Sequence, residues 1–155
     1  MEPRIAATPI TWGFAGNNRW GIDLPQERIL SEMVQVGFNA TETGVPGFLP
    51  HDGIEARAIL EKHGLRATSG PVSFVIHEEG SRQSALETVR KAGHRLVTMG
   101  GEVLITVPKP GNRKSGEQLD EDGWKRLCEG LDAIEELCRS MGLEQALHPH
   151  VGSLV

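Results

Sequence analysis

The sequence has no long apolar run and no excess of positive charge, and each absence narrows the class of protein. No stretch of about 18 apolar residues occurs, so we expect no membrane span. The start, MEPRIAATPITWG, lacks the basic residues and apolar core of a signal peptide, which favours a cytoplasmic location. With a net charge of −5, the chain has little positive charge to hold a nucleic-acid backbone, and we expect no nucleic-acid partner.

Cysteine is also scarce, with two residues in the chain, Cys128 and Cys138. Both fall in one predicted helix, ten positions apart. Ten helical residues span about 15 Å, which is too far for a disulfide within that helix. We interpret both as reduced thiols in the core of a cytoplasmic protein.

What the chain does have is a recurring glycine, followed each time by a short apolar segment. A glycine just past a helix adopts a left-handed conformation without strain, so each copy indicates helix, glycine, strand and loop. The copies are VGFNATETG (36–44), HGLRATSGP (63–71), MGGEVLITVPKP (99–110) and MGLEQALHPH (141–150). The predicted strands are residues 4–13, 38–44, 65–74, 102–108 and 144–152.

Apolar residues at helical spacing predict four helices between these strands. Each helix is expected to turn its apolar face to the core. The expected core residues are Ile29, Leu30, Met33 and Val34 in 24–37; Ile54, Ala58, Ile59 and Leu60 in 53–64; Ala85, Leu86, Val89, Ala92 and Leu96 in 81–101; and Trp124, Leu127, Cys128, Leu131, Ile134, Cys138 and Met141 in 120–142.

Strict alternation of strand and helix predicts an α/β fold with parallel strands and right-handed crossovers. A doubly wound sheet and part of a (β/α)8 TIM barrel both fit, although no glycine-rich nucleotide motif follows any strand. A complete barrel takes about 250 residues. About five strands and four helices in 155 residues would make the N-terminal half of one. We therefore expect residues 1–155 to be a single partial barrel domain, truncated at or just after strand five.

In such a barrel the functional groups lie where strands end and loops begin, which selects a short set of residues. Trp12 and Trp20 would form an aromatic wall for a sugar or cyclitol ring, or else pack under a loop. Glu42 is an acid at an otherwise uncharged strand end, which favours a role as hydrogen-bond acceptor or base. Further candidates for substrate contacts are Ser69, Thr106 and Lys109.

His148 and His150 flank Pro149 at the predicted end of the fifth strand. The two-residue period of a strand places both imidazoles on one side. Neutral imidazoles are common ligands of Mn²⁺, Co²⁺, Zn²⁺ and Fe²⁺, but a catalytic site needs a third protein ligand. The remaining histidines fall in predicted helices or loops: His51, His63, His77 and His94. Of these, His51 is expected to make a loop contact, and the other three are given no role.

Three segments carry a resemblance to a known family: PITWG, LPQERILSEMVQVGFNATETGVPGFLP and ALHPHVGSLV. They resemble inosose dehydratase and its relatives in the xylose isomerase-like TIM-barrel superfamily of sugar isomerases and epimerases, a grouping that includes the sugar phosphate isomerase/epimerase family. The resemblance implies a complete barrel of roughly 250–300 residues. It also implies a divalent metal, Mn²⁺ or Co²⁺ before Zn²⁺ or Mg²⁺, whose other ligands would lie in a missing C-terminal half.

The resemblance further implies the chemistry and the roles of three residues. The metal polarises a carbonyl so that a neighbouring proton can be removed from a keto-sugar or cyclitol, and a dehydratase then expels a β-hydroxyl as water. His148 would be a metal ligand with His150 as a catalytic residue beside it. Glu42 would be the strand-two acid that contacts the substrate.

Two alternatives stay open. The chain on its own would be a catalytically incomplete half-barrel, which needs a second copy or a missing C-terminal half because its strand edges and interior are exposed. An endonuclease IV-like DNA repair enzyme of the same fold would need more histidines at strand ends and a basic surface. We expect the full-length relatives to be isomerases, epimerases or lyases of carbohydrate metabolism, and the 155-residue chain alone to be inactive.

Overall fold

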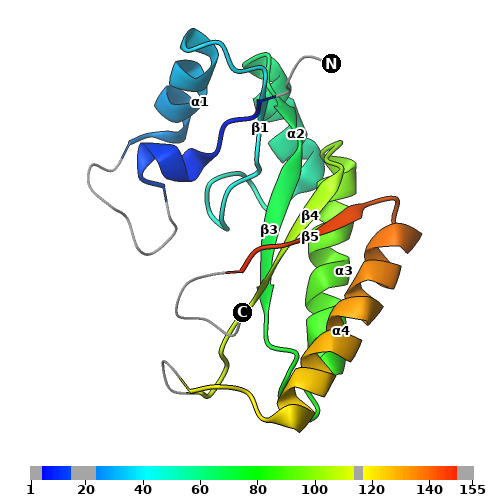
Figure 1. Ribbon diagram of the computed structural model, residues 1–155. Coiled ribbons are helices and arrows are strands. Elements are labelled where there is room, and N and C mark those ends of the chain that lie inside the picture. The colour runs from blue at the N-terminus through cyan, green and yellow to red at the C-terminus, as the bar shows by residue number, and fades with distance from the viewer. Residues whose placement is uncertain (1–4, 15–23, 114–116, 150–155) are drawn as a thin grey trace. The chain divides into compact units, whose positions relative to one another are not determined.

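The computed structural model describes residues 5–14, 24–113 and 117–149 (Figure 1). Two compact units make up the chain. Unit 1 is Met1–Gly70 with Arg95–Glu102, and unit 2 is Pro71–His94 with Val103–Val155. Within the described ranges, no helix is long and apolar enough to cross a membrane. The single partial domain expected for residues 1–155 stays a prediction.

Unit 1 alternates short helices with short parallel strands. Its elements are a 3₁₀ helix η1 (Pro9–Trp12), α1 (Gln26–Gln35), β1 (Ala40–Thr41), α2 (Gly53–Lys62) and β2 (Arg66–Ala67). β1 and β2 pair in parallel, with Ala40 opposite Arg66. An isolated parallel bridge between Ala7 and Thr41 adds the N-terminal segment beside β1. Successive strands are therefore neighbours, as in the wall of a barrel.

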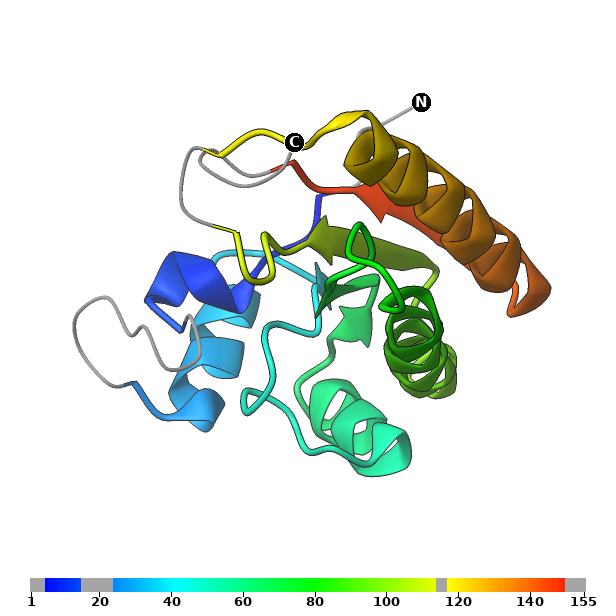
Figure 2. The same cartoon turned by 90° about the horizontal axis from the view of Figure 1, so that it is seen from below.

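Unit 2 carries a three-stranded sheet in the order β3-β4-β5. Its strands and helices are β3 (Ser69–Phe74, which starts at the end of unit 1), α3 (Arg82–Thr98, whose last turn belongs to unit 1), β4 (Val103–Pro108), α4 (Glu121–Ser140) and β5 (Glu144–Leu147). β4 and β5 pair in parallel from Val103 opposite Glu144 to Thr106 opposite Leu147. Figure 2 shows α4 running beside β5, at the edge of this sheet. The α/β alternation and parallel pairing confirm the fold class predicted from the sequence.

Local sequence explains where the helices begin. Asp52 caps α2, because its Oδ1 accepts hydrogen bonds from the amides of Ile54 (2.8 Å) and Glu55 (3.0 Å). Asp120 caps α4 in the same way, accepting from the amide of Gly123 at 2.7 Å. These side chains satisfy amides that have no partner inside the helix.

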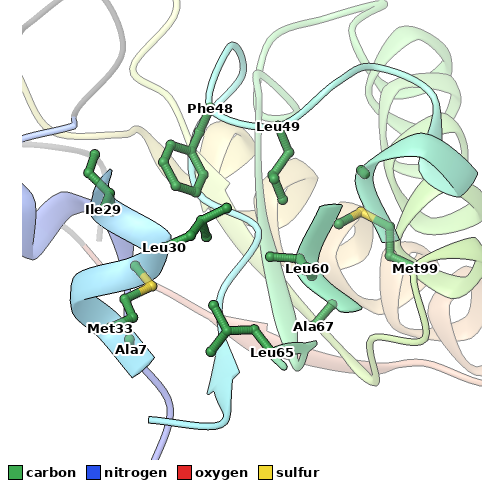
Figure 3. Close-up of a cluster of buried hydrophobic side chains, with 11 residues drawn as sticks. Ala7, Ile29, Leu30, Met33, Phe48, Leu49, Leu60, Leu65, Ala67 and Met99 are labelled. Carbon is green, nitrogen blue, oxygen red and sulfur yellow. The ribbon is translucent and has the colours of Figure 1, made fainter. Parts of the chain in front are cut away.

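The core of unit 1 is a cluster of apolar side chains from α1, α2 and the neighbouring strands (Figure 3). α1 contributes Ile29, Leu30 and Met33, each fully buried. Their spacing puts them on one face of the helix, and this face packs against the core of unit 1. The rest of the cluster is Ala7, Phe48, Leu49, Ala56, Leu60, Leu65, Ala67 and Met99.

Several predicted strands differ in extent from the structure. The second is shortened to Ala40–Thr41, and the fifth ends at Leu147 among the described residues. The first, residues 4–13, is reduced to the bridge at Ala7, because Pro9 starts a 3₁₀ helix that ends at Gly13 in a left-handed conformation (φ 82°). The third, residues 65–74, is interrupted at Thr68. β2 pairs with β1 before the interruption, and β3 pairs with β4 after it.

Several residues predicted to face the core are exposed. Val34, Ile54 and Trp124 keep 41%, 70% and 42% of their surface accessible. Cys138 is buried, which raises the pKa of its thiol, but Cys128 is exposed, so the prediction of two core cysteines is wrong for Cys128. A helix buries a stripe of its surface, and hydrophobicity alone does not fix where the stripe ends.

Candidate functional site

The acid predicted at the second strand end is held by a hydroxyl from the first segment. Glu42 directly follows β1, and its amide donates to the carbonyl of Ala7 at 2.9 Å. Thr8 Oγ1 donates to Glu42 Oε2 at 2.9 Å in a half-buried setting. A carboxylate accepts several hydrogen bonds, so this contact orients Glu42 without using up its acceptor capacity. Thr8 was not among the predicted site residues, because a threonine within an expected strand carries no signal of its own.

Hydroxyl side chains follow the next strand end in unit 1. The Ser69 carbonyl accepts from the amide of Thr43 at 2.8 Å, and Ser69 Oγ lies 3.5 Å from Thr68 Oγ1. Thr43 is 3% exposed, and a Cβ at Gly70 would lie 2.7 Å from its Oγ1. Glycine at this position therefore keeps room for the hydroxyl of Thr43. Sequence reasoning selected Ser69 and missed Thr43 and Thr68.

Of the two tryptophans predicted to form an aromatic wall, the structure describes Trp12. Trp12 packs partly buried against the core of unit 1, and its Nε1 donates to Glu32 Oε2 at 2.9 Å. Arg28 donates to the other oxygen of Glu32 at 2.7 Å. The hydrogen bonds from Arg28 and then Trp12 lower the pKa of the Glu32 carboxyl. Glu32 therefore fixes the indole of Trp12, whereas Trp20 lies outside the described residues.

In unit 2 the Thr106 hydroxyl joins two strands. Thr106 is fully buried near the end of β4, and its Oγ1 donates to the Ala146 carbonyl at 3.3 Å. Gln145 Nε2 donates to the same hydroxyl at 3.1 Å. These bonds satisfy a buried polar group between β4 and β5. A substrate contact from Thr106 stays a prediction.

His148 follows β5 directly, and its amide donates to the Thr106 carbonyl at 2.9 Å. Its side chain is exposed, as is that of Lys109 at the end of β4. His150 lies outside the described residues. In the part of the chain that the structure describes, no group of three or more His, Cys, Asp or Glu side chains is arranged to hold a metal ion.

A groove of about 500 Å³ lies between α4 and β5 in unit 2. It is lined by both apolar and charged side chains, among them Leu131, Glu135, Arg139 and Leu147. None of the predicted site residues lines it.

No family model matches the chain. Among curated proteins, an inosose dehydratase of Geobacillus kaustophilus is 26% identical over 98% of this chain and 52% of its own length. The chain resembles inosose dehydratases. One from Bacillus licheniformis is 29% identical over 96% of this chain and 53% of its own length. The resemblance read from the sequence is thus confirmed, and the chain spans about half the length of these dehydratases.

Solved structures show the same fold. The IOLI protein with a bound zinc atom superposes with a TM-score of 0.69 at 14% identity, covering 94% of this chain and 51% of its own. An AP endonuclease, family 2, from Brucella melitensis gives 0.74 at 15% identity over 99% and 60%. An L-ribulose 3-epimerase gives 0.66 at 16% identity over 94% and 49%. The chain therefore has the α/β fold of about half of a TIM barrel.

Proposed function

We propose that this chain is part of a metal-dependent enzyme that removes a proton next to the carbonyl of a keto-cyclitol or keto-sugar. The observation that carries the proposal is the similarity to inosose dehydratases along 98% of the chain. Dehydration of an inosose is the favoured reaction, and isomerisation or epimerisation of a keto-sugar is the second. All of these reactions begin by breaking a C–H bond beside a carbonyl.

In this proposal Glu42 takes the proton or accepts a hydrogen bond from a substrate hydroxyl. The hydrogen bond from Thr8 keeps Oε2 engaged, so the carboxylate has a fixed orientation toward a ligand. In a dehydration, the electron pair of the broken C–H bond forms the enolate, and its collapse expels the β-hydroxyl, which leaves with a proton as water. Other substrate contacts are assigned to Trp12, Trp20, Ser69, Thr106 and Lys109.

A divalent metal would polarise the carbonyl in such a reaction. Mn²⁺ or Co²⁺ is the favoured ion, while the IOLI neighbour holds zinc. The described residues supply one suitable imidazole, His148, but no complete set of ligands. These residues alone do not complete a metal site, so the remaining ligands would have to come from outside the described part of the chain. His150 is assigned the catalytic position beside His148.

Exchange of the α-proton with solvent tests the proposal, because it reports the first step of each of these reactions. A chain whose 155 residues suffice for this step will incorporate deuterium beside the carbonyl when incubated in D2O with Mn²⁺ or Co²⁺ and an inosose, as measured by loss of the ¹H NMR signal. The inactive half-barrel expected from the sequence will not. The rate without protein is the reference. A folded chain that exchanges no faster than this reference, with either metal, contradicts catalysis by these 155 residues.

Metal binding gives a second prediction. Calorimetric titration with Co²⁺ is expected to show binding that His148→Ala weakens by about tenfold or more, since loss of a ligand removes a coordinate bond. His94→Ala is the matched control, because it removes an exposed imidazole on α3. Equal weakening by both substitutions would contradict the assignment of His148 as a ligand.

The alternative, a catalytically incomplete half-barrel, is favoured by the edge of the unit 2 sheet. β5 is the last strand of that sheet, Leu147 is 44% exposed, and the groove between α4 and β5 lies beside it. An edge of this kind pairs with a further strand from a second copy or a missing half. Under this alternative, metal binding would appear in a dimer and be absent from the monomer when the species are separated by sedimentation. A DNA repair role is not favoured by a net charge of −5.

A further inference from the structure

In unit 2, hydrogen bonds join the loop that follows β3 to the residues that follow β4. Glu78, in the loop after β3, accepts from the Asn112 amide at 2.7 Å and from Asn112 Nδ2 at 3.4 Å. The amide of Lys109 donates to the Phe74 carbonyl at 2.7 Å. A Cβ at Gly111 would fall 2.1 Å from Glu78 Oε1, so glycine permits this close approach. The two loops therefore form one fixed surface at the carboxyl ends of their strands.

His77, in the loop after β3, has a buried imidazole. The residue is 3% exposed, and its carbonyl accepts a 2.6 Å hydrogen bond from Arg126 Nε on α4. In the described part of the chain, neither ring nitrogen has a hydrogen-bond partner. Buried polar atoms without partners are rare, because each one loses its hydrogen bonds to water and gains none in the protein.

Arg113, in the loop after β4, also has buried nitrogen atoms without hydrogen-bond partners among the described residues. These atoms are Nε and Nη2. Nε and Nη2 donate in parallel from one side of the guanidinium. This pair of donors, the fork of Arg113, can bind two oxygens of one carboxylate or phosphate. An arginine carries its charge at any ordinary pH, so the fork favours an anion.

His77 and Arg113 each adjoin one partner of the hydrogen bond between Glu78 and the Asn112 amide. Burial is the largest effect and lowers the pKa of the His77 imidazole. The negative charge of Glu78 raises this pKa, whereas the positive charges of Arg113 and Arg126 lower it further. The Pro110 carbonyl also favours the protonated form, although no hydrogen bond of normal geometry joins it to the ring. The lowered pKa favours the neutral imidazole, which has one N–H group that can donate a hydrogen bond to a ligand.

We propose that the loops after β3 and β4 form an oxyanion-binding site, in which the fork of Arg113 and the ring of His77 hold a phosphate or carboxylate group of a small ligand. Two unpartnered nitrogens of a guanidinium and a buried imidazole are the donors that such a group would satisfy. The site uses residues of unit 2 alone and does not depend on the function proposed above. From the sequence alone, His77 was given no role and Arg113 was not selected.

Titration of the whole chain with inorganic phosphate and, separately, with acetate tests this site. Ionic strength is held constant with sodium chloride, and the His77 ring signals, assigned with His77→Gln, are followed by NMR. We expect saturable shifts and a rise in the pKa of His77 on binding, because the anion offsets the charges of Arg113 and Arg126. Phosphate binding alone indicates a phosphate ester as the ligand, acetate binding alone indicates a carboxylate, and binding of both supports the shared oxyanion chemistry.

Two substitutions and one control separate the fork from general charge. Arg113→Ala is expected to weaken anion binding by about tenfold or more, and Arg113→Lys to weaken it as well, because lysine keeps the charge but lacks the fork. Lys125→Ala removes an exposed positive charge on α4 and should leave binding unchanged. The proposal is overturned if the folded wild-type chain binds neither anion, or if Lys125→Ala weakens binding as much as Arg113→Ala does.

Discussion

Replacement of Glu42 by glutamine is expected to slow α-proton exchange by about 10²- to 10⁴-fold, the contribution typical of a positioned general base. Glutamine has the same shape, and its amide oxygen still accepts the hydrogen bond that Thr8 donates to Oε2. The substitution therefore removes proton acceptance and leaves the local structure in place. The measurement is the rate of deuterium incorporation beside the carbonyl of an inosose, compared with wild type under the same conditions.

Glu79→Gln is the matched control for this experiment, since Glu79 is an exposed acid that is not among the candidate site residues. It changes the net charge by the same amount, so its exchange rate should equal that of wild type. If Glu42→Gln exchanges the α-proton as fast as an active wild-type chain, the assignment of Glu42 as the base is wrong. That result would leave the proposed reaction standing with a different proton acceptor.

Truncation of Ile29 to alanine is expected to lower the free energy of unfolding by about 2–5 kcal/mol. Ile29 is fully buried on α1, in the cluster that includes Leu30 and Phe48. Removing its outer carbons leaves a cavity that the surrounding side chains fill only in part. The measurement is the midpoint of urea unfolding followed by circular dichroism, read at constant slope so that the shift reports stability.

Ile54→Ala makes the same chemical change at the start of α2, where the side chain is 70% exposed. We expect its effect to stay within about 0.5 kcal/mol, because little burial is lost and alanine favours the helix. Comparable midpoint shifts for the two variants would mean that Ile54 is covered in solution, and that the burial found for α2 is incomplete.

The site was accessible to sequence reasoning only where a residue type stood out at a strand end. Glu42 qualified because it is an acid next to uncharged residues, and the structure places it directly after β1. Thr8 did not qualify, since its role depends on the pairing that brings it to Glu42 across 34 positions. His77 and Arg113 were missed for the same reason, because their loops meet only when β3 and β4 lie side by side.

By itself the sequence determined the alternation of helix and strand, the parallel pairing and the resemblance to inosose dehydratases. Helical periodicity and capping residues such as Asp52 and Asp120 act within a few positions, so they can be recognised without a tertiary structure. Tertiary structure alone decided that the first segment forms a bridge at Ala7 and a 3₁₀ helix at Pro9–Trp12, that Ile54 faces solvent, and that His77 is buried. Strand pairing and burial depend on partners far away in the chain, and local sequence does not specify those partners.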